Sequence, residues 1–336
     1  MIFDSDIKND RIDLGGKIDI NIKEAMQDDD EDDTFRFNFK GMSVDYSVIN
    51  ALRRTVMSNV LVYGFNRKNI FIENEKCIYM YNNDLIYNQI ETLPVYDVPN
   101  SYDLEDLEEL PNTQDKNKKL RNIEIFLNVK NDSDDHRYIT THDIVIKIDD
   151  KVSDGYKKHD PLSIIVLKPQ EEVHLRAVAN LSDSLNHAAY EACTFAYHIE
   201  VNQMEYVLIY DTLGQISKYD IFTKSCNILI KKLDALLNYV NELENETENK
   251  TNIGEYDLVG ENDTLGCLLA TILQKCEHTA IAGYFSPHEF VDQVIIRFRL
   301  NEKTKLMPSQ VFIAVIKHAK SIYEHILKTF QKAIKS

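Results

Sequence analysis

The chain has 336 residues, of which 43% are hydrophobic, and its 55 acidic against 38 basic side chains give a net charge of −17. A protein that grips nucleic acid by its backbone needs clustered lysine and arginine, so this charge disfavours extensive direct DNA binding. No apolar run reaches the roughly 20 residues of a membrane helix, and no secretory leader is visible. We therefore expect an intracellular protein of two or three domains that does not bind membranes.

The cysteines are five in number, an odd count, and none of them shows CxxC spacing. This distribution indicates neither a disulfide framework nor a zinc knuckle. The stretch "HRYITTHD" offers His136, His142 and Asp143, but their spacing fits no standard zinc pattern. We expect no metal and no other cofactor.

The amino-terminal part begins with polar residues 1–33, which end in the acidic run "QDDDEDD", and this run is typical of a solvated tail or loop. In "TFRFNFK" (34–40) phenylalanine alternates with polar residues, which predicts a strand. A helix is predicted next, over about 44–59, in "DYSVINALRRTV". It carries Arg53 and Arg54 inside an apolar run, although a surface helix often carries arginine for solubility alone.

A β-rich block is predicted over residues 64–203. Short strands and turns are expected over 70–98, and a loop over 100–120. Alternation predicts strands in "IEIFLNVK" and "HDIVIKI". Two further strands are expected to be joined by a turn at Pro169 and Gln170.

Two long helices are predicted at about 218–245 and 308–334, with a polar linker at 245–254 after the first. Their apolar residues step alternately by four and three, which is the heptad spacing of helix packed on helix. The positions are Phe222, Cys226, Leu229, Leu233, Leu236, Val240 and Leu243 in one helix, and Phe312, Ile316, Ala319, Tyr323, Ile326, Phe330 and Ala333 in the other. A shorter helix after the linker has its own apolar stripe, formed by Leu265, Leu268, Leu269 and Ile272.

The order strand, short helix, strand, long helix thus occurs twice, and such a repeat indicates two similar modules paired about a pseudo-twofold axis. The alternative is that each long helix only covers its own sheet. We predict an α+β fold with a β-rich domain inserted in the first module. The expected divisions are an acidic segment at 1–33, the first module at 34–63 and 204–244, the inserted domain at 64–203, the linker at 245–254, and the second module at 255–336.

The first copy resembles the alpha-like proteins of multisubunit RNA polymerases, namely the bacterial alpha amino-terminal region, the archaeal D protein and the third-largest subunit of polymerase II. "SVINALRRTVMSNV" is similar to the "NALRR" helix of that family, and "YNNDLIYNQIETLPV" to its segment ending in "IPL", with Pro94 at the family's proline. "IIVLKPQEEVHLRAVA" and "NHAAYEACTFAYHI" resemble two further family segments.

The second copy resembles the smaller partner, the archaeal L protein or the eleventh subunit of polymerase II. "ENDTLGCLLATIL" matches "DHTLGNLLR", and "AGYFSPHEFVDQVIIRF" matches "AGYxxPHPLxxxxxIRI". The two resemblances cover roughly residues 34–335 and imply that two subunits of a heterodimer are fused in one chain. Such fusions are a feature of large DNA viruses with their own transcription machinery.

The chain departs from the family pattern at several positions. Asn88 and Gln89 replace a His-Arg pair, Cys267 replaces the asparagine of "TLGN", and Gln170 follows the proline where the family has glycine. Many cellular relatives carry a four-cysteine zinc loop in the inserted domain, whereas the region at about 90–130 has no cysteine. This departure supports the expectation of no structural zinc.

The resemblance implies a non-catalytic assembly platform of a DNA-directed RNA polymerase. Its implied partners are the two largest subunits, with a small zinc-bearing subunit as a further candidate, and no homo-oligomer is expected. Docking is expected at Asn50, Arg53, Arg54 and His187. Internal pairing is expected at Phe222, Leu229, Leu233, Leu236, Val240, Leu265, Leu268, Leu269, Phe312, Ile316, Tyr323, Ile326 and Phe330. The implied location is the host cytoplasm or a viral factory, with packaging in the virion and the nucleus left open.

No catalytic residue is assigned, because no phosphate-binding glycine loop, HExxH, GxSxG or "DxDGD"-like triple carboxylate occurs. His187 and His288 are expected to be structural. Two alternatives stay open. One is an acidic scaffold or nucleic-acid mimic that binds a basic partner, and the other is an enzyme with an unfamiliar site.

Overall fold

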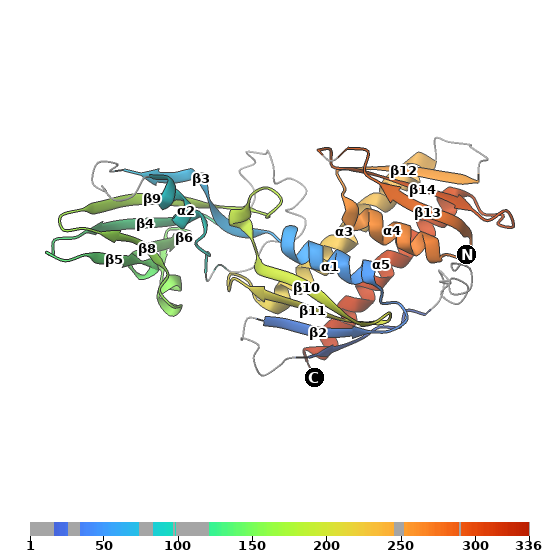
Figure 1. Ribbon diagram of the computed structural model, residues 1–336, viewed down its shortest axis with the longest axis horizontal. Helices are drawn as coiled ribbons and strands as arrows, with labels where there is room; N and C mark the ends of the chain where they lie inside the picture. Colours follow the sequence, from blue (N-terminus) through green and yellow to red (C-terminus); the bar gives the residue numbers. More distant parts are fainter. Residues whose placement is uncertain are drawn as a thin grey trace. The chain divides into compact units, whose positions relative to one another are not determined.

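The computed structural model describes residues 17–25, 34–73, 83–96, 98, 121–244, 252–288 and 290–335. The chain divides into two compact units (Figure 1). The first unit comprises Met1–Val56, Phe195–Tyr210 and Phe222–Ser336, and the second Met57–Thr194 and Asp211–Ile221. The acidic run "QDDDEDD" and the loop predicted at 100–120 lie outside the described residues. None of the described helices is both long and apolar enough to cross a membrane.

The first unit contains a four-stranded sheet in the order β1-β2-β11-β10. Its strands are β1 (Asn21–Glu24), β2 (Thr34–Lys40), β10 (Cys193–Asn202) and β11 (Glu205–Thr212). The alternation in β2 buries every second residue, including Phe35 and Phe39. Strand β1, which was not predicted, pairs with β2 and places buried Ile22 opposite Phe39. Residues 195–203 also belong here rather than to the inserted domain, because β10 lies beside β11.

A three-stranded sheet in the same unit has the order β12-β14-β13. Its strands are β12 (Ile253–Val259), β13 (Thr279–Phe285) and β14 (Gln293–Leu300), and β14 is antiparallel to both neighbours. This order repeats the order β2-β11-β10 of the other sheet, since in each the first strand of the copy pairs with the last. Strand β13 was not predicted, although it completes the repeat.

The helices of the first unit are α1 (Tyr46–Ser58), α3 (Lys218–Glu244), α4 (Asp263–Lys275) and α5 (Pro308–Ala333). They lie between the two sheets (Figure 1). Asp45 caps α1 by accepting a hydrogen bond from the Val48 N–H at 3.0 Å, and Asn262 caps α4 through the Thr264 N–H at 3.0 Å. We call residues 34–56, 195–210 and 222–244 the first module, and residues 253–333 the second module.

Gly266, the glycine of the "TLG" motif, lies where α4 approaches its own sheet closely. A Cβ atom there would lie 2.7 Å from Tyr284 Cδ2 and 2.7 Å from Val294 Cγ1. Alanine normally stabilises a helix interior by about 1 kcal/mol relative to glycine. Here we expect Gly266→Ala to lower the free energy of unfolding by about 1–3 kcal/mol, because the side chain overpacks a tight contact.

Urea-induced unfolding, followed by circular dichroism, measures this change. Gly283→Ala is the matched control, because an added Cβ at Gly283 meets no atom within 4 Å. A Gly266→Ala chain more stable than the wild type would show that close packing does not require the glycine.

The second unit is built on a five-stranded sheet in the order β3-β9-β4-β6-β7, with a two-stranded sheet of β5 and β8. Its elements are β3 (Val62–Ile72), α2 (Asn83–Glu91), β4 (Ile123–Lys130), β5 (Arg137–Thr140), β6 (Val145–Ile148), β7 (Lys151–Ser153), β8 (Ser163–Leu167) and β9 (Glu172–Ser182). The core includes Phe65, Ile125, Leu127 and Leu175, which are contributed by β3, β4 and β9.

One local prediction for this unit needs correction, and another is confirmed. Residues 83–91 form α2 rather than strands and turns, because Ile86 and Ile90 are four apart and both buried on one side of a helix. The two strands predicted on either side of a turn at Pro169 and Gln170 are present as β8 and β9, which belong to different sheets. In the turn between them, Gln170 has a φ of 65°, which lies in the left-handed region that favours glycine.

Candidate module-pairing and docking site

The carboxyl end of α5 contacts an aromatic cluster of the first module. The ring of Phe330 lies 5.8 Å from Phe35 and 5.2 Å from Phe37 of β2, measured between centroids, and 4.3 Å from Phe222 of α3. All four rings are fully buried. The second module therefore buries one of its largest side chains against the sheet and the long helix of the first module.

The amino end of the same helix contacts its own sheet. Phe312 stacks on Tyr256 of β12, with ring centroids 4.3 Å apart, and lies 5.9 Å from Phe298 of β14. Phe312 and Phe330 are separated by 18 residues, or about 27 Å along a helix that rises 1.5 Å per residue. Helix α5 thus packs on the sheets of both modules rather than covering only its own.

The residues expected to pair the modules are buried without exception. They are Phe222, Leu229, Leu233, Leu236, Val240, Leu265, Leu268, Leu269, Phe312, Ile316, Tyr323, Ile326 and Phe330. Tyr323 of α5 also donates its hydroxyl to the backbone oxygen of Val48 in α1 at 3.3 Å. Burial raises the pKa of Tyr323, so the hydroxyl stays neutral and keeps its proton for this bond.

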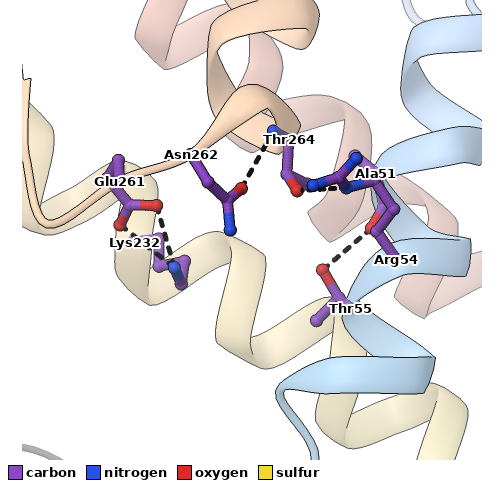
Figure 2. Close-up of polar contacts among 7 residues, drawn as sticks. All are labelled: Ala51, Arg54, Thr55, Lys232, Glu261, Asn262 and Thr264. Carbon is purple, nitrogen blue, oxygen red and sulfur yellow. Dashed lines mark hydrogen bonds and ion pairs between the residues drawn. The ribbon is translucent and has the colours of Figure 1, made fainter. Parts of the chain in front are cut away.

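Polar contacts join the two short helices at opposite ends. Lys275, at the last turn of α4, donates to Asp45 at the start of α1 at 3.0 Å. Arg54, near the end of α1, donates from Nε to the Thr264 hydroxyl at the start of α4 at 2.8 Å (Figure 2). The two helices therefore run antiparallel. The Asp45 carboxylate lies at the amino end of α1 and the Lys275 ammonium at the carboxyl end of α4, where the helix dipoles favour a negative and a positive charge, respectively.

Two ion pairs connect the long helices to the other module. Lys232 of α3 contacts Glu261 just before α4 at 2.8 Å (Figure 2), and Lys320 of α5 contacts Asp234 of α3 at 2.6 Å. The side chains are about one-fifth to two-fifths exposed, so each pair contributes on the order of 0–1 kcal/mol. Their main effect is to favour this alignment of the helices over a shifted one.

The predicted docking residues of α1 lie on its half-buried side. Arg53 donates from Nε to Asn50 Oδ1 at 3.0 Å, and burial, followed by the neighbouring Arg54, lowers the pKa of Arg53. Burial and the Arg53 charge lower the pKa of His198 on β10, which places a second titratable group beside this face. The Nε atoms of both arginines are bonded within the chain, that of Arg53 to its own helix and that of Arg54 to the second module, so the hypothesis that these side chains contact another protein concerns their remaining nitrogens.

Three other histidines make local contacts within the chain. His187, predicted to dock, lies in the second unit and accepts the Ala189 N–H at Nδ1 at 3.1 Å, and His288 accepts the Phe290 N–H at 3.1 Å. His142 Nε2 lies 2.9 Å from the His159 carbonyl oxygen. Within the described ranges, no group of three or more His, Cys, Asp and Glu side chains is arranged to hold a metal ion.

Comparison with known proteins decides the family. A family model described as the RNA polymerase Rpb3/Rpb11 dimerisation domain matches residues 254–329. A protein of Acanthamoeba polyphaga mimivirus, named provisionally as a DNA-directed RNA polymerase subunit, is 40% identical over 342 residues, which cover 94% of this chain and 95% of that protein. The chain belongs to the Rpb3/Rpb11 family of RNA polymerase subunits.

Archaeal relatives match a shorter part of the chain. The RNA polymerase subunits Rpo11 of Saccharolobus shibatae and Saccharolobus solfataricus are 25% and 24% identical over 80 residues, which are 24% of this chain and 85% of each relative. The resemblance drawn from the motifs is thereby confirmed, and transcription is the process in which this subunit takes part. The viral relative aligns with both modules, so the fused arrangement also occurs in that protein.

Proposed function

We propose that this subunit is a non-catalytic platform that pairs its two modules internally, about a pseudo-twofold axis, and docks the two large catalytic subunits of its polymerase. The main observation that supports the proposal is the packing of α5 on the sheets of both modules. It buries Phe330 in the first module and Phe312 in the second, as expected if a heterodimer interface has become intramolecular. The residues that form it are thus unavailable to a second copy of the chain.

The strand order and the helix lengths support the pseudo-symmetry. The strand order of one sheet repeats that of the other. Helices α1 and α4 have 13 residues each, and α3 and α5 have 27 and 26.

The copies differ in charge, because Arg53 and Arg54 of α1 correspond in the repeat to Ala270 and Thr271 of α4. We infer that this difference tells one large subunit from the other, since a guanidinium binds carboxylates and carbonyls through a planar fork.

Co-purification tests the proposal. A tagged chain, expressed in cells that make the whole polymerase, is expected to bring down two polymerase-sized subunits, whereas the purified chain alone should transfer no nucleotides. Failure to recover either large subunit, or nucleotidyl transfer by the chain alone, would contradict the platform role.

A further inference from the structure

Strand β10, at one end of the four-stranded sheet, exposes a row of apolar side chains. Phe195, Tyr197, Ile199 and Val201 alternate along it and are 40%, 43%, 44% and 55% exposed. The rings of Phe195 and Tyr197 lie 5.7 Å apart between centroids, which places them on the same face. The solvated face of an antiparallel sheet is normally polar, so packing within the described chain does not explain this row. We call these four residues the β10 row.

The same strand has an open edge. Strand β10 is terminal in the described sheet, so alternate backbone N–H and C=O groups along it face no described strand. Natural proteins usually protect such edges with lysine, proline or a bulge. The ten residues "CTFAYHIEVN" contain neither lysine nor proline, and residues 199–202 are all exposed. Among the described residues, Glu200 is the one charged side chain of this edge, and such a long edge with an apolar face is suited to pairing with a strand of another chain.

The opposite side of the edge carries charges of both signs, because Arg53 and Glu200 both act on the His198 ring. Half-exposed Tyr46 packs edge-on against His198, with ring centroids 5.3 Å apart. The Nδ1 atom of His198 is buried and has no hydrogen-bond partner among the described residues. The charge of Arg53 acts on this same ring, which places the guanidinium beside the strand. An acidic residue of an added strand would therefore find Arg53 as its cationic partner at this side, next to the Glu200 carboxylate of β10.

We propose that β10 accepts an added strand, an extended segment of one large polymerase subunit in which apolar and acidic side chains alternate. Its apolar residues would cover the β10 row, and an acidic residue on its other face would pair with Arg53. Backbone hydrogen bonds would supply affinity, and the alternation would fix the register. This inference rests on the proposed function and adds the mode and the chemistry of docking.

Substitution of residues in the β10 row tests whether its side chains contact the large subunit. In the full chain, Tyr197→Lys with Ile199→Lys is expected to weaken binding of the large subunit about 10–100-fold, as for the loss of two central anchors. Val145→Lys with Val152→Lys, at exposed apolar positions of β6 and β7, is the matched control and should bind as the wild type does. Equal loss in both variants, or in neither, would overturn the inference.

Amide hydrogen exchange of the assembled complex tests whether the β10 backbone forms hydrogen bonds with an added strand. The fast-exchanging amides within residues 195–202 are expected to slow on assembly, in alternation along the strand. Unchanged exchange there, with both large subunits bound, would overturn strand addition and leave the platform role intact. Absence of the large subunits from the wild-type complex would instead refute the platform role itself. If the chain alone formed a dimer that Tyr197→Lys with Ile199→Lys splits, the occupant would be a second copy and the inference would be wrong.

Discussion

Replacing Phe330 by alanine is expected to separate the two halves of a chain that has been cut within residues 245–251. Phe330 is fully buried and contacts Phe35, Phe37 and Phe222 across the module boundary. Truncating a buried phenylalanine to alanine costs about 3–5 kcal/mol, because apolar burial is lost and a cavity remains. Since 1.4 kcal/mol is tenfold in a dissociation constant, association should weaken roughly 100- to 3,000-fold.

The measurement uses a protease site placed in the predicted linker, followed by size-exclusion chromatography of the cut protein. The wild-type halves should elute as one species at micromolar concentration, and the Phe330→Ala halves as two. Phe290→Ala makes the same substitution at a side chain that is 91% exposed, so its halves should stay together. If the cut wild-type halves separated, or the Phe330→Ala halves did not, internal pairing through this cluster would be refuted.

Periodicity was sufficient to predict the elements that bury one face. The heptad spacing predicted a helix over 218–245, and α3 spans Lys218–Glu244 with Phe222 and Leu233 buried. The alternation in "TFRFNFK" predicted β2 with its phenylalanines inward. These patterns are informative because burial of a single face leaves its period in the sequence. The short helix α2 was missed because its two buried isoleucines are too few to establish a period.

The polar contacts between the modules left no comparable trace. Arg54 and Thr264 are 210 residues apart in the chain, and Asp45 and Lys275 are 230 apart. In the sequence, a half-buried arginine that bonds within its own chain looks the same as one that faces a partner. Only the three-dimensional arrangement distinguishes Arg54, whose Nε donates to Thr264 of the other module, from Arg53, whose Nε donates within its own helix and whose charge acts on His198 of the edge strand β10.

Substitutions of the adjacent residues Arg53 and Arg54 in α1 are expected to have large but different effects. Arg53→Glu should leave the fold intact and lower recovery of a large subunit at least about 30-fold. The reason is that reversing a charge at a docking contact costs about 2–5 kcal/mol or more. Arg54→Ala should mainly weaken the attachment of the second module, because a hydrogen bond from a charged donor contributes about 1.5–3 kcal/mol.

The two effects are distinguished by measuring both co-purification and the dissociation of the cut chain for each variant. Thr264→Val removes the acceptor of the Arg54 bond and should reproduce the pairing defect of Arg54→Ala. Arg299→Glu makes the same charge reversal as Arg53→Glu at an exposed position of β14 and should retain the large subunits. Full retention of both large subunits by Arg53→Glu combined with Arg54→Glu would eliminate the docking role of this helix. Because that result would leave the aromatic cluster untouched, internal pairing would still stand on the Phe330 experiment.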